Sequence, residues 1–463
     1  MTGPAPAGMP GPAPAAGAAL APVGAPGLAP VTHRRVLGIA IPIVLSNATV
    51  PLIGLVDTGV VGQLGEAAPI GAVGLGAVIL AAFYWIFGFL RMGTSGLVAQ
   101  ARGAGDGAEV AAHLVRALVI AGAAGLFCIL AQGALFWAAF RVAPASAEVE
   151  GLALEYLVIR IWGAPATVAL YAVNGWLIAT ERTRGVLALQ LWMNVLNILL
   201  DLWFVLGLGW GVEGVAVASL AAEWTGLGLG LWFCRAALIG GGWRDRARVF
   251  ERVQLRRIAA VNGDILVRSV LLQFSFTAFV FLGADFGDVT LAANQVLLQF
   301  LEFTAYALDG FAFAAEALVG QALGARAQAS LRRGALLTSG WGLGAVLAMA
   351  LGFAVAGGAI IDLMATSPEV RAEARAFLPW MVAAPLVGLA AWMLDGIFIG
   401  ATRTREMRNA MFLSVAAYAG ALALLLPVLG NHGLWAALMV LFVARGVTLW
   451  RAYPGLERAA LGS

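Results

Sequence analysis

Long apolar segments separated by short polar ones run through the sequence from about residue 36 onward. Each is long enough to cross a bilayer as a helix, which takes about 20 residues. Their richness in Gly and Ala favours closely packed helices over barrel strands of about 10 alternating residues. The predicted fold class is therefore all-α, a polytopic membrane protein with twelve transmembrane helices. The segments lie at roughly 36–62, 70–98, 110–140, 152–180, 186–208, 212–236, 256–283, 289–322, 334–362, 377–402, 409–430 and 433–451.

The pattern repeats at one fixed offset. Adding 221 to the residue number pairs Gln100 with Gln321, and it pairs residues 182–184 with residues 403–405, both Arg-Thr-Arg. Because six helices per copy is an even number, the copies should be related by a pseudo-two-fold axis along the membrane normal. Parallel repeats of this kind are typical of alternating-access transporters. The predicted parts are a tail at 1–32, six-helix lobes at 33–240 and 257–455, an Arg-rich cytoplasmic linker at 241–256 and a cytoplasmic tail at 456–463.

Composition and charge support a membrane protein. The chain is 61% hydrophobic and 11% charged, whereas soluble domains are about 25% charged. Its 28 basic residues are all Arg, and most lie before odd-numbered spans and after even-numbered ones. By the positive-inside rule both termini are cytoplasmic, in a multi-pass protein of the cell (inner) membrane. This distribution explains the net charge of +3 without a nucleic-acid partner, and the Ala-, Pro- and Gly-rich tail is expected to be disordered.

Polar side chains interrupt one face of the fifth span. Asn194, Asn197 and Asp201 lie at i, i+3 and i+7, which places them on one stripe of a helix. A carboxylate within a membrane span is costly and marks a functional site by default. Asp57 and Asp201 each precede an outer loop by eight residues, about 12 Å of helix. Ser219 of the sixth span lies at the same depth, so these residues are expected to form one cluster.

The repeat assigns this cluster to the first lobe. Adding 221 to Asp57 and Asp201 leads to an alanine and a leucine. Two carboxylates in a low dielectric cannot both stay charged without a cation, so a shared proton or Na⁺ is expected. Oxygen ligands from Asp57, Asp201, Asn197 and Ser219 would suit Na⁺ as well as a proton relay. The alternative is a structural role, in which each acid hydrogen-bonds a neighbour for helix packing.

Other polar residues in the spans leave a choice between cargo binding and structure. Asp264 is followed by Arg268 at the spacing of a helix ion pair. Mutual neutralisation would make this pair structural, whereas Asp309 and Asp395 fit either role. The residues open to both interpretations are Tyr171, Asn174, Asn194, Asp264, Arg268, Asp309 and Asp395.

Two prolines lie within the first span. Pro42 and Pro51 each remove a backbone hydrogen bond and can kink the helix. A bent helix offers an element with two states that Asp57 could bias.

Seven segments together resemble the multidrug and toxic compound extrusion (MATE) family, most closely its branch named after DNA-damage-inducible protein F. They are residues 45–58, 89–94, 171–184, 194–201, 262–268, 307–312 and 395–405. The resemblance covers the chain after His33. It implies a twelve-helix, V-shaped antiporter with two lobes, which expels cationic or amphipathic organic compounds in exchange for inflowing H⁺ or Na⁺.

The resemblance also implies roles for individual residues. Asp57 occupies the place of the coupling acid on the first helix. Asp201 and Asn197 match the polar cluster on helix five, and Ser219 stands where helix six often carries Thr. Other branches use acids on helix seven or eight, whereas Asp264 and Asp309 follow the pattern of this branch.

The leading functional hypothesis is multidrug efflux by secondary active antiport. Export of an organic acid or a lipid-linked precursor is the alternative, and it would need several cations facing the cleft. The deep arginines are few, which favours a cationic or neutral cargo: Arg91, Arg160, Arg268 and Arg445.

An enzyme is not expected, because catalysis would need a His or Cys cluster or a nucleophile with a base. The three histidines lie at helix ends or in loops: His33, His113 and His432. No cofactor is expected beyond the coupling H⁺ or Na⁺. The expected partners are a small organic substrate, the coupling cation and the lipid bilayer, and the chain is expected to act as a monomer.

Overall fold

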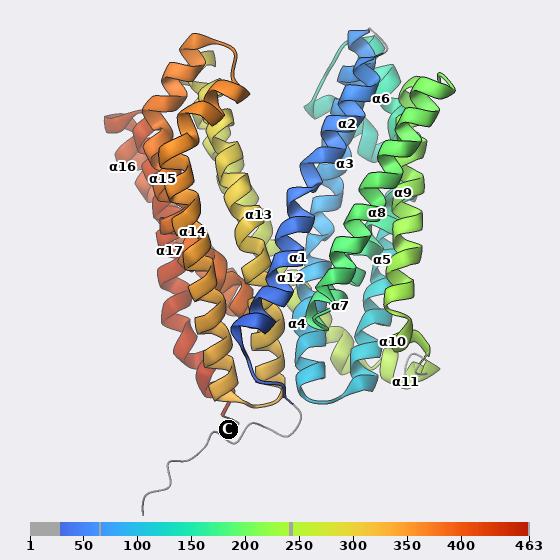
Figure 1. The fold of residues 1–463 in the computed structure, drawn as a ribbon, viewed down its shortest axis with the longest axis vertical. Helices are drawn as coiled ribbons and strands as arrows, with labels where there is room; N and C mark the ends of the chain where they lie inside the picture. The colour runs from blue at the N-terminus through green and yellow to red at the C-terminus, as the bar shows by residue number, and fades with distance from the viewer. Residues whose placement is uncertain (1–27, 64–65, 240–243, 462–463) are drawn as a thin grey trace, which may run out of the picture.

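The computed structural model describes residues 28–63, 66–239 and 244–461, and the regular structure of these residues is helical. The helices form two bundles that lie together at one end and separate toward the other (Figure 1). This confirms the predicted all-α fold with two lobes. The predicted disordered tail falls mainly on residues 1–27, which lie outside the described residues.

The first lobe consists of α1 (His33–Ala48), α2 (Val50–Gly62), α3 (Ala67–Trp85), η1 (Ile86–Gly88), α4 (Phe89–Gly103), α5 (Gly107–Val142), α6 (Ala147–Arg160), η2 (Ile161–Gly163), α7 (Ala164–Ala179), α8 (Thr183–Asp201), η3 (Leu202–Gly207) and α9 (Gly211–Phe233). The short helices α10 (Arg235–Ile239) and α11 (Arg246–Val249) follow. The second lobe consists of α12 (Arg252–Ala284), α13 (Asp288–Gly324), α14 (Gln328–Met364), α15 (Pro368–Gly400), α16 (Thr404–Leu429) and α17 (Asn431–Ala459). Thus α12 begins within the predicted linker, and α17 extends into the predicted tail at 456–463.

The first predicted span is divided into two short helices. Eleven helical segments of the described residues are long and apolar enough to cross a membrane, and α1 with α2 completes the predicted twelve. The division falls at Thr49, between a helix of 16 residues and one of 13. Pro51 lies in the first turn of α2, where its missing N–H is tolerated but its ring obstructs a continuous helix. Pro42 lies inside α1 without ending it.

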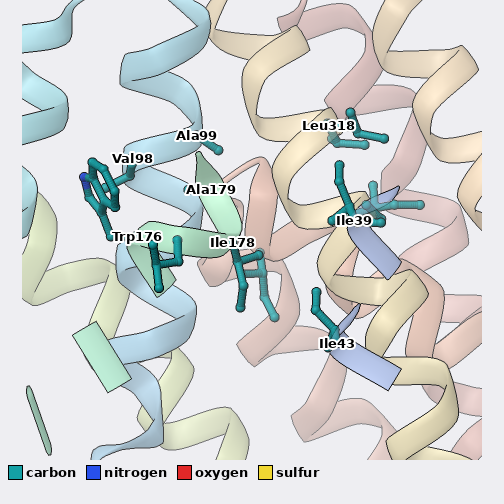
Figure 2. Close-up of a cluster of buried hydrophobic side chains, with 14 of the residues drawn as sticks. Ile39, Ile43, Val98, Ala99, Trp176, Ile178, Ala179 and Leu318 are labelled. Carbon is teal, nitrogen blue, oxygen red and sulfur yellow. The ribbon is translucent and has the colours of Figure 1, made fainter. Parts of the chain in front are cut away.

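Buried apolar side chains form three clusters. One cluster joins both lobes where α4 and α13 end, and it includes Ile39, Ile178 and Leu318 (Figure 2). A second cluster, around Tyr156, belongs to the first lobe, and a third, around Trp435, belongs to the second lobe. The lobes therefore share a core at one end and have separate cores at the other. This accounts for the V shape in Figure 1.

The joined end repeats the same contacts at positions 221 residues apart. The amide of Gln321 donates to the carbonyl of Ala179 at 3.0 Å, and the amide of Gln100 donates to the carbonyl of Gly400 at 3.1 Å. Left-handed backbone also occurs at paired positions, with φ 76° at Gly105 and 53° at Arg326. The repeat in the sequence is therefore a repeat of contacts across the seam between the lobes.

The first-lobe copy of this seam contains an ion pair. Arg35 lies 2.7 Å from Glu181 and also donates to the side-chain oxygen of Gln321 at 2.9 Å. Burial acts to raise the pKa of Glu181, but the hydrogen bonds and charge of Arg35 outweigh it, so this pKa lies below its usual value. At the equivalent position Thr402 accepts a hydrogen bond from Gln100 instead.

The seam depends on two glycines, and replacing either should destabilise the fold. A Cβ on Gly103 would lie 1.9 Å from the carbonyl oxygen of Gln321, and one on Gly324 would lie 2.0 Å from that of Gln100. We expect Gly103→Ala and Gly324→Ala each to lower the free energy of unfolding by about 1–3 kcal/mol, because the lobes must move apart. Thermal unfolding in detergent measures this.

Gly122→Ala is the matched control, because a Cβ on this residue of α5 meets no atom within 4 Å. It should leave the unfolding temperature unchanged or raise it slightly, since Ala is the better helix former. Equal unfolding temperatures for the seam and control variants would contradict the close packing of the seam.

Candidate functional site

The acids of the first lobe meet around the amide of Asn197. Asp57 comes from α2, Asp201 from the last turn of α8 and Ser219 from α9. The Asn197 amide donates to Asp57 Oδ1 at 3.0 Å and also to the carboxylate of Asp201. The hydroxyl of Ser219 donates to Asn197 Oδ1 at 3.1 Å. One side chain thus links three helices, and the four residues predicted to cluster lie together.

This site is rich in buried oxygen and poor in donors. Asp57 is 7% exposed and Asp201 0%. Asp201 Oδ1 has no hydrogen-bond partner among the described residues. Two carboxylates this close repel one another unless a positive charge intervenes. The unpartnered oxygen and the set of hard ligands therefore fit a proton or Na⁺.

The helix widens immediately after Asp201. Residues Leu202–Gly207 form the π-helical turn η3, and positive φ angles follow at Gly209 and Gly211. Turns of this type occur frequently at functional sites. The apolar run there gave no sign of a π turn in the sequence.

Asn194 connects the site helix to the break in the first span. Its amide donates to the carbonyl of Thr49 at 3.1 Å. Beside the break, the amide of Asn47 donates to the carbonyl of Tyr306 in α13 at 3.3 Å. The polar stripe of α8 therefore leads from Asn197 to the break, and the break contacts the second lobe.

A second charged pair lies beside the acids. Arg160 Nη2 is 2.8 Å from Glu223 Oε1, between the end of α6 and α9. Glu223 follows Ser219 by one turn of α9, so this pair lies next to the cluster around Asn197. The sequence analysis did not identify Glu223. Its spacing of four residues from Ser219, which places both on one helix face, was the available signal.

The predicted ion pair between Asp264 and Arg268 was wrong. Arg268 donates instead to Asp395 of α15, and Arg445 of α17 donates to the same carboxylate at 2.5 Å. Asp264 binds Arg408 at 2.7 Å. A pair within one helix contributes only about 0.2–0.5 kcal/mol, whereas a buried carboxylate such as Asp395 requires a partner. Arg268 therefore pairs with the buried carboxylate of Asp395 and not with Asp264 of its own helix.

Another ion pair crosses from one lobe to the other. Arg91 of α4 lies 3.2 Å from Glu316 of α13, which is fully buried, and 3.9 Å from the ring centre of Phe313. The sequence analysis missed Glu316, because its partner is on the other lobe. Asp309 is half-buried on the same helix, and it forms no ion pair or hydrogen bond with the described residues.

Tyr171 and Asn174 lie half-buried on α7. No hydrogen bond within the described ranges joins either residue to Asp57 or Asp201. Asn174 Oδ1 is buried and has no partner among the described residues. These two residues therefore lie outside the acidic cluster, and their role in cargo binding or in structure stays a prediction.

Comparison with known proteins gives consistent matches. The MatE family matches residues 42–203 and 265–423. DNA damage-inducible protein F of Escherichia coli (strain K12) is 41% identical over 419 residues, which are 90% of this chain and 91% of that protein. The chloroplastic protein DETOXIFICATION 44 of Arabidopsis thaliana is 25% identical over 432 residues, 90% of this chain and 81% of that protein.

A solved structure shares the fold. The Vibrio cholerae MATE transporter VcmN, in a crystal structure described as the bent form, has a TM-score of 0.83. Its sequence identity is 21%, over 92% of this chain and 97% of that one.

The corrected pairing in the second lobe predicts unequal effects of removing two acids. Asp395→Asn should lower the free energy of unfolding by about 3–5 kcal/mol, because it leaves two buried guanidinium groups without a carboxylate. Asp264→Asn should cost about 0–1 kcal/mol, because Arg408 is partly exposed to solvent. Thermal unfolding of the two variants in one detergent tests this order, and the reverse order would contradict the pairing.

Proposed function

Because the chain belongs to the MatE family of multidrug and toxic compound efflux transporters, we propose that it exports cationic or amphipathic organic compounds in exchange for inflowing H⁺ or Na⁺. The family predicted from the sequence is thereby confirmed. The observation that carries the proposal of antiport is the single amide of Asn197 between two buried carboxylates. Because so little positive charge lies beside these two carboxylates, the site favours a cation that can bind and dissociate.

The orientation of the chain follows from its arginines. With both termini in the cytoplasm, the joined end of the lobes is the cytoplasmic one, and the separated ends face outward. The acids of the first lobe then lie in the outer half of the membrane. An inflowing cation comes from the side of the membrane nearer to Asp57 and Asp201.

The break in the first span provides the mechanical link. A cation at Asp57 neutralises the carboxylate to which the Asn197 amide donates. Asn194, on the same helix as Asn197, donates to the carbonyl of Thr49. The adjacent Asn47 bonds to α13 of the second lobe. Binding of the cation therefore biases the angle between α1 and α2, and this angle changes the contact between the lobes. By favouring one of two angles between α1 and α2, a bound ion shifts the populations of two conformations.

The charge pairs of the second lobe and of the contact between the lobes favour a cationic or neutral cargo. An organic acid or a lipid-linked precursor, the alternative cargo, would need free guanidinium groups. Arg268 and Arg445 both bind Asp395, and Arg91 binds Glu316.

Replacing the coupling acid should abolish exchange. In everted vesicles supplied with a lipophilic organic cation, Asp57→Asn should reduce cargo-induced release of H⁺ and of Na⁺ to the level of vesicles lacking the protein. The reason is that the amide carries no charge for an ion to neutralise. The two ions are measured separately, which also identifies the coupling ion.

Asp362→Asn is the control for this experiment. Asp362 lies near the end of α14, partly exposed and 2.5 Å from Arg375, and its variant should retain transport. Full retention of both ion signals in Asp57→Asn would end the coupling assignment.

We expect the break between α1 and α2 to be needed for transport but not for insertion of the protein into the membrane. Pro51→Ala allows α1 and α2 to join as one helix, so we expect slower efflux at an unchanged amount of protein in the membrane. Pro368→Ala is the control, because Pro368 lies in the first turn of α15, where Pro only begins a helix. Equal efflux by both variants and the unmodified protein would contradict a role for the break.

A further inference from the structure

The ion pair beside the acidic site leaves several polar atoms unused. Arg160 Nε, Arg160 Nη1 and Glu223 Oε2 are buried without a hydrogen-bond partner among the described residues, as is Asp201 Oδ1. More than about 90% of buried polar groups in proteins have a partner. Unpartnered donors and unpartnered acceptors thus occur together beside the acidic site.

The local backbone gives Arg160 room to change partners. Arg160 is the last residue of α6, directly before the 3₁₀ turn η2. A Cβ on Gly163 in that turn would lie 2.0 Å from Glu223 Oε2, so the glycine is what lets the carboxylate lie against η2. A long arginine side chain at a helix end can redirect its guanidinium without moving the helix.

The other titratable groups around Arg160 do not carry positive charge. The hydroxyl of Tyr84, from α3, lies 3.5 Å from the Arg160 carbonyl oxygen, and the Arg160 guanidinium lies 6.0 Å from the ring centre of Tyr156. Cys128 of α5 packs in the same buried cluster as Tyr84 and Tyr156. Glu223 follows Ser219 by one turn of α9, and Ser219 bonds the Asn197 that links the two acids. Among these described residues Arg160, held by Glu223, is therefore the cation next to the acidic cluster.

The pair of Arg160 and Glu223, like the two acids, is present in the first copy of the repeat and absent from the second. Adding 221 to 160 gives Met381, and adding 221 to 223 gives Ala444. The second lobe thus lacks Arg160 and Glu223 at the equivalent positions, as it lacks Asp57 and Asp201. A pair needed only for packing the lobe would have no reason to occur together with the acids.

We propose that Arg160 is a tethered counter-ion of the coupling site, a positioning residue that competes with the coupling cation. While H⁺ or Na⁺ occupies the two acids, Glu223 holds the guanidinium through Nη2. When the ion leaves, Nε and Nη1 donate to the carboxylates of Asp57 and Asp201. At the two acids one monovalent cation replaces another: H⁺ leaves by breaking a carboxyl O–H bond, and Na⁺ leaves by losing its oxygen ligands. Glu223 gives up the guanidinium in this step, so the group of Asp57, Asp201, Glu223 and Arg160 becomes one charge more negative when the ion departs. The inference rests on the proposed coupling role of the acids.

Two variants that differ only in the guanidinium test this. Glu223→Gln removes a competing negative charge and frees Arg160 for the acids, which favours their ionised form. The pH at which the acids are half protonated should therefore fall by about one unit or more. Adding Arg160→Gln removes the counter-ion, and the midpoint should rise again by at least about one unit.

The measurement is an infrared titration of the purified protein in lipid. It follows the carbonyl band of protonated carboxylic acid, and the part of the band that Asp57→Asn abolishes identifies the site. Arg445→Gln is the matched control, because it removes a buried arginine of the second lobe whose partner, Asp395, retains Arg268. Its midpoint should equal that of the unmodified protein.

The outcomes separate the two proposals. Equal midpoints for Glu223→Gln and the double variant would overturn the role of Arg160 and leave the coupling role intact. An unchanged midpoint in Glu223→Gln would overturn it as well, even where the double variant does not fold. A band unaffected by Asp57→Asn would overturn the coupling assignment itself.

Discussion

The constraint on which this structure depends is the cost of burying charge in a medium that cannot solvate it. The two lobes meet this constraint differently. In the second lobe, Asp395 is bound by Arg268 and Arg445, so its charge is compensated by groups of the chain. In the first lobe, Asp57 and Asp201 share one neutral amide. In the proposed mechanism a mobile cation supplies the missing compensation, so the first lobe responds to the ion while the charge pairing of the second lobe stays fixed.

The seam between the lobes obeys a second constraint, that of close backbone approach. Gly103 and Gly324 lie so close to the carbonyl groups of Gln321 and Gln100 that there is no room for a Cβ atom at either glycine. Contacts of this type are directional and short, so they are lost completely when the lobes separate. An interface with few intermediate positions suits a protein with two states, because packed interfaces tend to be bistable.

Sequence reasoning recovered what depends on position along a helix. The rise per residue fixes depth, and depth alone placed Asp57, Asp201 and Ser219 at one level. It failed where rotation about the helix axis decides the outcome, as when Arg268 faced Asp395 of another helix instead of Asp264. Glu316 was missed for the same reason, because its partner Arg91 belongs to the other lobe. Contacts between distant helices depend on packing, which a single sequence does not determine.

The path from the acids to the seam explains why the responsive lobe also contains the broken helix. A continuous first span would transmit a change at Asp57 along its whole length, and the helix would have to move as a unit. The division at Thr49 lets α2 respond to the ion while α1 stays packed in the core that both lobes share. Asn194 donates to the carbonyl of Thr49 at the division, and Asn47, in the last turn of α1, donates to the carbonyl of Tyr306 in α13. In the proposed mechanism the broken helix converts a local change of charge into a change of the angle between α1 and α2, and the core that both lobes share limits how far that change spreads.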